Sequence, residues 1–243
     1  MTWSILARDD EGRFGIAIAS RFFAVGSLCS HSMRGVGALS TQALMNPLYG
    51  PKGMAALASG MSAADTMELL ISADAGSAQR QLHILPVIGQ PVAHTGAQCI
   101  DWCGHLQGDD FSVAGNMLAG PQVIAATADA YRNSAGQPMA ERLLAAMLAG
   151  EQAGGDKRGK QAAALRIQGD EDYLELDLRV DDHAEPLLEL QRIYEKSLER
   201  FQPFLSCLAG RQNPVGIIDR TVIEDKVVQF QEQLAARRST AKN

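Results

Sequence analysis

The order of the apolar segments constrains the fold of this chain more than any single motif does. Strand-like segments at residues 3–7 and 14–19 flank the turn-forming residues 9–12, and this pattern predicts a β-hairpin. A third strand is predicted at 36–41. A pair of helices follows, the second opening at Ser62 with a capping pattern. The chain therefore begins with strands and continues with paired helices.

The same order then repeats along the chain. Short strands, two helices with apolar residues at three- and four-residue spacing, and a second hairpin are predicted in turn, at 81–87, 91–95, 111–115, then 121–131 and 139–149, then 162–167 and 173–180. Runs of strands followed by helix pairs favour sheets covered by helices over alternating βαβ units. We therefore expect a layered α+β sandwich.

Two amphipathic helices are predicted near the C-terminus, at 187–201 and 222–237. We expect a first domain over residues 1–202, and a linker with an amphipathic helix over residues 203–243. Because the sandwich is already complete by Val180, we expect a second copy of the chain to cover the apolar faces of these helices, as a homodimer. The alternative is that both faces pack on their own domain.

The composition limits the classes of partner. The chain carries 22 Lys and Arg against 28 Asp and Glu, a net charge of −6, which argues against binding nucleic acid through its phosphates. Its longest apolar stretches, such as 143–149, fall far short of the roughly 20 residues that cross a membrane. The first residues lack the basic segment of a signal peptide, so we expect a cytoplasmic protein with no membrane association.

The four cysteines are too few for a disulfide framework, and we expect free thiols. Cys99, Cys103 and His105 raise the question of zinc, but their spacing lacks the close pairs of structural zinc sites. We expect no metal site and no cofactor.

Thr2 is the sharpest candidate for chemistry. Removal of Met1 is expected before a small residue, and it would leave a threonine whose own α-amino group lies beside its hydroxyl. Such an amino group titrates at about 7.7–8.0, so it can accept the hydroxyl proton without a histidine. The alternative is that Thr2 only marks the start of translation.

Seven blocks of this sequence resemble, in order, a bacterial and archaeal family catalogued as domain of unknown function 1028. The blocks are residues 2–9 (TWSILARD), 15–26 (GIAIASRFFAVG), 35–43 (GVGALSTQA), 94–96 (HTG), 115–118 (GNML), 154–161 (GGDKRGKQ) and 177–183 (DLRVDDH). The resemblance spans roughly residues 1–200. It implies a member of the N-terminal-nucleophile hydrolase superfamily, with a four-layer α-β-β-α sandwich and amide-bond cleavage.

The resemblance also implies a small amidated or peptidic substrate, with cell-wall amides among the candidates because some relatives carry peptidoglycan-binding domains. Better-known threonine hydrolases of the superfamily have a lysine on the third strand, whereas residues 36–41 contain none. Arg21 is one of the nearest cations, and Thr41 and Gln42 can offer hydrogen bonds at that strand end. The rival interpretation is a catalytically silent ligand-binding or oligomeric scaffold protein on the same fold.

The segment 154–161 has the glycines and lysine of a phosphate-binding loop, but Gln161 replaces the Ser or Thr that would bind magnesium. The segment also follows a helix and precedes a strand, the reverse of a phosphate-binding loop. We expect Asp156 and Arg158 to face the N-terminal amine and a substrate carboxylate, or else to form a solvated helix end.

Asn116 follows a predicted strand. It is either a donor to the substrate's oxyanion or amide, or an ordinary turn asparagine.

Overall fold

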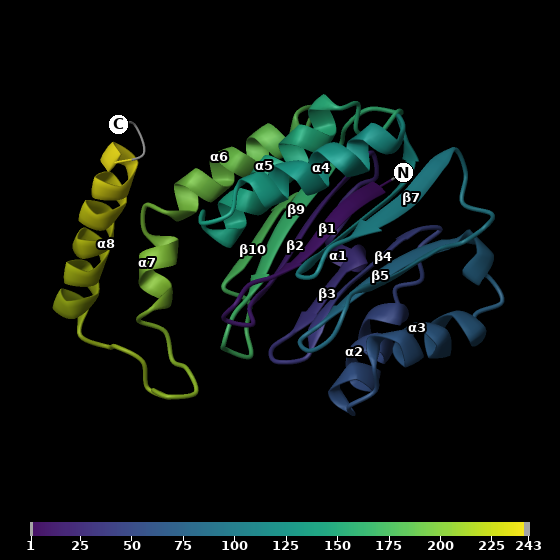
Figure 1. Cartoon of the computed structure of the whole chain (residues 1–243). Coiled ribbons are helices and arrows are strands. Elements are labelled where there is room, and N and C mark those ends of the chain that lie inside the picture. Colours follow the sequence, from purple (N-terminus) through teal and green to yellow (C-terminus); the bar gives the residue numbers. More distant parts are fainter. Residues whose placement is uncertain (1, 241–243) are drawn as a thin grey trace. The chain divides into compact units, whose positions relative to one another are not determined.

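The computed structural model describes residues 2–240, which fall into two compact units, the first extending to Leu190 and the second beginning at Gln191 (Figure 1). The first unit contains two antiparallel sheets and most of the helices. The predicted α+β class is thereby confirmed. Within residues 2–240, no helix combines the length and the apolar character needed to span a membrane.

The larger sheet has six strands, and β1 lies near its centre. Its spatial order is β10 (Leu176–Val180), β9 (Ala162–Gln168), β2 (Phe14–Ser20), β1 (Thr2–Arg8), β8 (Phe111–Leu118) and β7 (Trp102–Gln107). The predicted first hairpin is the β1–β2 pair, with Thr2 opposite Ser20. On its other side β1 pairs with β8, which places Thr2 opposite Asn116.

The smaller sheet has four strands, in the order β3 (Ser30–Met33), β4 (Gly37–Ala43), β5 (Arg80–Pro86) and β6 (Val92–Thr95). Three of these strands were predicted. The sequence did not predict β3, the single-turn helix α1 (Gly26–Cys29) before it, or β7 in the larger sheet.

Each sheet packs against a pair of helices (Figure 1). Helices α4 (Pro121–Asn133) and α5 (Met139–Gln152) lie on the larger sheet. A Cβ atom at Gly15 would approach Leu143 Cδ1 to 2.4 Å, so the glycine permits the close approach of α5 to β2. Helices α2 (Tyr49–Ala58) and α3 (Ala63–Ser72) lie on the smaller sheet, with the short 3-10 helix η1 (Ser77–Gln79) following.

The two sheets meet through a mixed interface. One part is apolar and is built from Leu6, Phe14 and Ile16 of the larger sheet with Ala38 and Leu85 of the smaller one. The other part consists of hydrogen-bonded polar side chains, among them Ser4 of β1 and His83 of β5, which are both fully buried. This polar part extends along β1 from Ser4 to Thr2.

The C-terminal helices are α6 (Pro186–Ser197), α7 (Phe201–Leu205) and α8 (Arg220–Thr240). Leu187 and Leu190, on the apolar face predicted for the first amphipathic helix, are already fully buried within one chain. On α8, Val222 and Val228 remain 41% and 56% exposed. Other exposed apolar side chains of this region precede α8, among them Leu188, Phe201, Val215 and Ile218.

Candidate functional site

Thr2 lies at the first position of β1, with both neighbouring strands bonded to it. Its side chain is buried, and Oγ1 donates a hydrogen bond to Ser20 Oγ at 3.1 Å. From β8, Asn116 Nδ2 donates to the backbone oxygen of Thr2 at 3.3 Å. The hydroxyl and the carbonyl of Thr2 are thus each held by one flanking strand.

Gln81 of β5 fixes the orientation of Asn116. Its Oε1 accepts from Asn116 Nδ2 at 3.0 Å and from Gln42 Nε2 at 2.8 Å. Its Nε2 donates to Thr95 Oγ1 at 2.9 Å and to the backbone oxygen of Gly115 at 2.8 Å. Gln81 is fully buried, so these contacts bind the smaller sheet to the strand that carries Asn116.

A second buried chain of hydrogen bonds reaches Gln42 from His83. Burial, followed by the proximity of His105, lowers the pKa of His83 to about 3, so its ring is neutral. Nδ1 lies 3.0 Å from Ser112 Oγ and Nε2 lies 2.9 Å from Ser4 Oγ. Ser4 Oγ donates to Gln42 Oε1 at 2.8 Å.

The Ser4 hydroxyl has one proton; when it donates that proton to Gln42 Oε1, the Nε2–H group of His83 donates to Ser4 Oγ and Nδ1 accepts from Ser112 Oγ. The hydrogen bonds then run in one direction, from Ser112 through His83, Ser4 and Gln42 to Gln81. This chain fixes the orientation of each side-chain amide in the interface.

The loop after α5 is fastened beside Thr2 by Asp156. The Asp156 side chain is only 2% exposed, and it accepts hydrogen bonds from the backbone N–H groups of Arg21 and Arg158, both at 2.8 Å. It also forms an ion pair with Arg158 Nη2 at 3.3 Å. The Arg21 guanidinium in turn donates to the backbone oxygen of Arg158. Asp156 therefore ties this loop to the end of β2.

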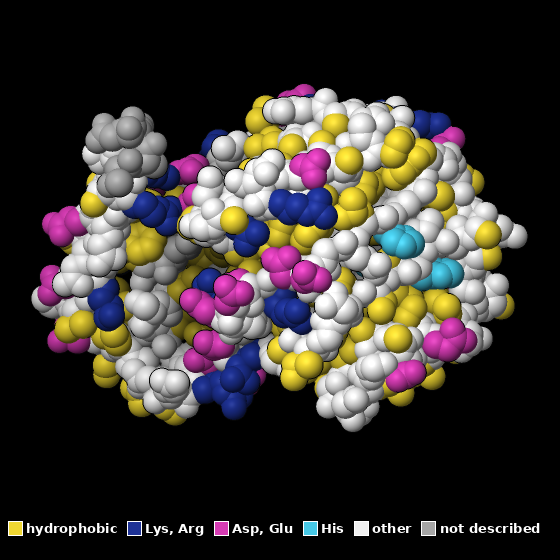
Figure 2. Space-filling view, viewed as in Figure 1, with side chains coloured by type: hydrophobic (Ala, Val, Ile, Leu, Met, Phe, Trp, Pro, Cys, Tyr) yellow, Lys and Arg dark blue, Asp and Glu magenta, His cyan; other side chains and the backbone are white. Residues whose placement is uncertain are grey.

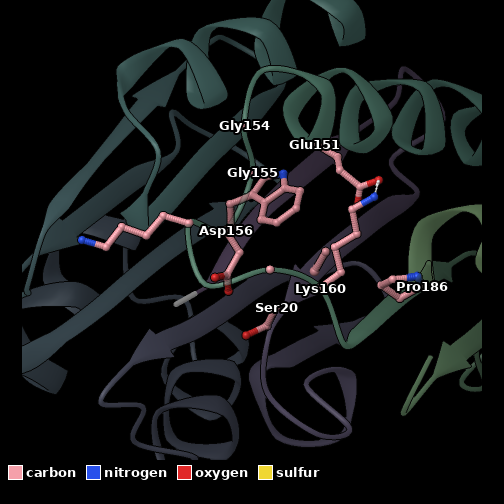
Figure 3. Close-up of a pocket in the computed structure, with 11 residues that line it drawn as sticks. Ser20, Glu151, Gly154, Gly155, Asp156, Lys160 and Pro186 are labelled. Carbon is pink, nitrogen blue, oxygen red and sulfur yellow. Dashed lines mark ion pairs between the residues drawn. The ribbon is translucent and has the colours of Figure 1, made fainter. Parts of the chain in front are cut away.

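A cavity of about 270 Å³ opens on the α5 side of this loop (Figure 3). Ser20 and Asp156 lie near each other along it, away from the ion pair of Lys160 with Glu151 at 3.0 Å. Lys160 also pairs with Glu185, and that bond is the main cause that raises the pKa of Lys160. Two carboxylates, those of Glu151 and Glu185, therefore pair with the ammonium group of Lys160.

A second cavity, of about 580 Å³, is lined by Asn116, Met117, Ala43 and Arg158 among others. Ala43 and Met117 stand at the ends of β4 and β8 with φ angles of 66° and 53°. Because Ser20 lines the first cavity and Asn116 the second, Thr2 lies between residues that border both.

The structure brings together most of the residues singled out from the sequence. Thr2 and Asn116 are in contact, Gln42 reaches Asn116 through Gln81, and Arg21, Asp156 and Arg158 form one cluster. Removal of Met1 concerns a residue outside the described range.

Thr41 lies apart from this group. Ser40 and Gln42 face the larger sheet, so Thr41 faces the opposite side of β4, where its Oγ1 accepts from the backbone N–H of Asn46 at 3.3 Å.

Near the second cavity, Cys99 and Cys103 are free thiols, and burial raises the pKa of each. His105 Nδ1 lies 2.9 Å from Thr95 Oγ1. Across the described part of the chain, no group of three or more His, Cys, Asp or Glu side chains is arranged to hold a metal ion.

Sequence reasoning missed Ser4, Ser20, Gln81 and His83. A signal for them was present, because polar residues alternate with apolar ones within several of the predicted strands. Alternation alone is usually the sign of a strand with one solvated face. Here the polar residues lie between the two sheets, where those of one sheet contact those of the other.

Comparisons with known proteins agree on a family. The sequence model of a family of unknown function, DUF1028, matches residues 2–190. The fold resembles the crystal structure of a protein from Silicibacter pomeroyi that carries the same family assignment, with 27% identity and a TM-score of 0.83, over 90% of this chain and 96% of that chain. It also resembles Anbu, the ancestral beta-subunit, from Yersinia bercovieri, with 11% identity and a TM-score of 0.42, over 81% of this chain and 94% of that chain. None of the curated proteins matches the sequence.

Proposed function

This chain belongs to the DUF1028 family of unknown function, and we propose that it is a hydrolase of amide bonds that uses Thr2 as an N-terminal nucleophile. In this proposal the two sheets and their helix pairs form a four-layer α-β-β-α sandwich of the N-terminal-nucleophile-hydrolase type. The substrate is a small amidated or peptidic molecule, and cell-wall amides are among the candidates.

One observation carries the proposal. The Thr2 hydroxyl is held at 3.1 Å from Ser20 Oγ at the end of a central strand, between residues that border two cavities. A hydroxyl fixed in this way has a defined direction of attack, which lowers the entropic part of the reaction barrier. The net charge of −6 and the mixture of acidic and basic side chains on the face of the first unit in Figure 2 fit a small-molecule substrate better than a nucleic acid.

The reaction proceeds in two steps once Met1 has been removed. The α-amino group of Thr2 accepts the hydroxyl proton while Oγ1 attacks the amide carbonyl carbon. The C–N bond then breaks, the leaving amine takes the proton, and the acyl group remains on Thr2 as an ester. Water attacks this ester, which releases the carboxylic acid and restores the hydroxyl.

Asn116 has a positioning role in this scheme. Its side-chain amide carries two N–H groups and donates to Thr2 O and to Gln81 Oε1, so we assign it to holding the Thr2 backbone. Arg158, anchored by Asp156, is the proposed partner of a substrate carboxylate, with Arg21 bracing the loop. Because β4 contains no lysine, proton transfer falls to the α-amino group alone.

Intact-mass measurement and chemical labelling test the proposal. The purified protein should lack Met1, and an electrophile directed at N-terminal threonine should add one label, located on Thr2 by peptide mapping. Retained Met1 in a preparation that hydrolyses amides would exclude Thr2 as the nucleophile. Loss of Met1 without labelling or turnover of any amide would instead favour the silent binding scaffold.

A further inference from the structure

Part of the wall of the 580 Å³ cavity is formed by large apolar side chains that are exposed to solvent. Phe22, Leu44 and Ile100 line it and are 49%, 59% and 60% exposed. They come from three separate segments, which follow β2, β4 and β6 along the chain. Large apolar side chains that gather around a cavity in this way are typical of a ligand-binding surface.

The same cavity contains a cationic group that the fold holds in place. Arg158 lines it, and the buried carboxylate of Asp156 bonds both the backbone and the guanidinium of this arginine. The planar guanidinium can bind a carboxylate through two parallel hydrogen bonds, which a lysine cannot reproduce. The cavity therefore offers an apolar surface and a carboxylate partner together.

The backbone around the cavity supplies an independent sign. Ala43 and Met117, which both line it, have φ angles of 66° and 53°, in the left-handed region that side chains with a Cβ rarely adopt. Strained backbone of this kind clusters at ligand sites, where the surrounding structure holds it. Here the last residue of β4 and the last but one of β8 are both strained, and both line one cavity.

From these observations we propose that the cavity binds the amino acid half of the substrate amide, a unit with an apolar side chain and a free α-carboxylate. This proposal rests on the function given above. The apolar side chain lies against Phe22, Leu44 and Ile100, and the carboxylate pairs with Arg158. Hydrolysis by Thr2 then consumes water and releases an apolar amino acid from an N-acyl amino acid or from the end of a short peptide.

The size of the cavity fits this class of ligand. Sites for small organic molecules usually measure roughly 300–1,000 Å³, a range that includes this cavity of about 580 Å³. The cavity on the α5 side is smaller, about 270 Å³, and within residues 2–240 none of the exposed large apolar side chains lines it. The larger cavity is therefore the better site for the apolar side chain of such a ligand.

Calorimetric binding to the Thr2→Ala variant of the full chain tests the proposal without turnover. The probes are N-acetylglycine, N-acetylalanine, N-acetylnorvaline and N-acetylphenylalanine, each with its carboxamide counterpart. The dissociation constant should fall about fourfold for each added methylene group from glycine to norvaline. The carboxamides should bind about tenfold more weakly, because they lack the charged partner of Arg158.

Three further variants locate the binding to this cavity. Ile100→Ser should flatten the dependence on side-chain length, and Arg158→Ala should remove the preference for the carboxylate. Ile88→Ser is the matched control. Ile88 is 86% exposed and follows the last residue of β5, whereas the cavity lies near the first residue of that strand. Both isoleucines are exposed, so neither substitution opens a hole in the core.

The outcomes separate this proposal from the catalytic one. A flat series of dissociation constants, or a length dependence that survives Ile100→Ser, would overturn the subsite even if the wild-type protein hydrolyses amides. Graded binding in Thr2→Ala with no turnover by the wild-type protein would support the subsite and count against Thr2 as a nucleophile.

Discussion

The side-chain amide of Asn116 on β8 donates to the side-chain oxygen of Gln81 on β5 across 3.0 Å, so a residue of the smaller sheet sets the position of a residue that holds Thr2. The geometry of the candidate site therefore depends on residues of both sheets. It depends partly on buried polar side chains, such as Gln81 and His83, that line neither the 270 Å³ nor the 580 Å³ cavity.

Replacing Gln81 by leucine should be strongly destabilising. The change leaves the side chains of Asn116 and Gln42 and the backbone oxygen of Gly115 without their partner, at about 1–3 kcal/mol for each group that stays unpaired. Urea unfolding measures the loss. The control is Gln107→Leu, whose side chain is exposed and bonds Pro91 O at 3.0 Å, and a similar cost in both variants would contradict the role given to Gln81.

Acid should destabilise the protein through His83. Burial holds its pKa at about 3 in the folded state, whereas the unfolded chain titrates near 6.5, so between these values the unfolded state binds more protons. The free energy of unfolding should therefore fall as the pH drops from about 6.5 toward 3, by up to about 1.4 kcal/mol per pH unit. Denaturant unfolding at a series of pH values should show a shallower slope for His83→Gln and no change for His183→Gln, whose ring is exposed.

Asp156 should control the order of the loop that carries Arg158. Asp156→Ala removes the acceptor of the Arg21 and Arg158 backbone N–H groups and should cost about 1–3 kcal/mol for each that stays unpaired. Asp156→Asn keeps one of the two acceptors, so its loss in thermal unfolding should be smaller. The control is Asp177→Ala, which breaks the more exposed ion pair with Arg166. An equal loss of thermal stability in this variant would contradict the role given to Asp156.

Thr2→Ala should abolish amide hydrolysis while lowering stability by only about 1 kcal/mol, because the substitution removes one hydrogen bond, to Ser20. Thr2→Ser should keep part of the turnover, since it retains the hydroxyl. Steady-state kinetics of both variants are compared with Thr66→Ala, which removes a buried threonine hydroxyl from α3 and should leave turnover unchanged. Full activity of Thr2→Ala would place the nucleophile elsewhere.

The full chain should form a homodimer, because exposed apolar side chains, among them Val222 and Val228 of α8, remain in the C-terminal region. Light scattering at micromolar concentration gives the mass directly. Val228→Glu should shift the mass toward the monomer, while Val215→Glu, at an exposed position before the helix, should not. A monomeric mass for the unaltered chain would refute the dimer.

The elements that the sequence predicted well are those whose pattern is local. The strands of the first hairpin are short apolar segments on either side of a turn. Ser62 accepts from the backbone N–H of Asp65, as its capping pattern predicts. The missed elements lack such patterns. Helix α1 has four residues, β3 has four, and β7 is a half-exposed edge strand interrupted by Gly104.

The candidate site was predictable only in part for the same reason. The blocks around Thr2, Asn116 and Asp156 stand out in the sequence. Gln81 and His83 do not, because a polar residue in a strand is usually solvated. These two are buried only because the larger sheet packs against their side of β5. Thr41 is the opposite case, a residue predicted for the site that lies apart from it. It is next to Gln42 in the chain, but its side chain faces the other side of β4.

The central place of β1 also determines when the larger sheet can close during synthesis. The β1–β2 hairpin is made first, but its outer edges pair with β8 at residues 111–118 and with β9 at residues 162–168. At about 5–20 residues per second, the hairpin waits roughly 5–20 seconds for β8 and longer for β9. An emerging chain therefore leaves two strand edges unpaired until most of the first unit has been translated.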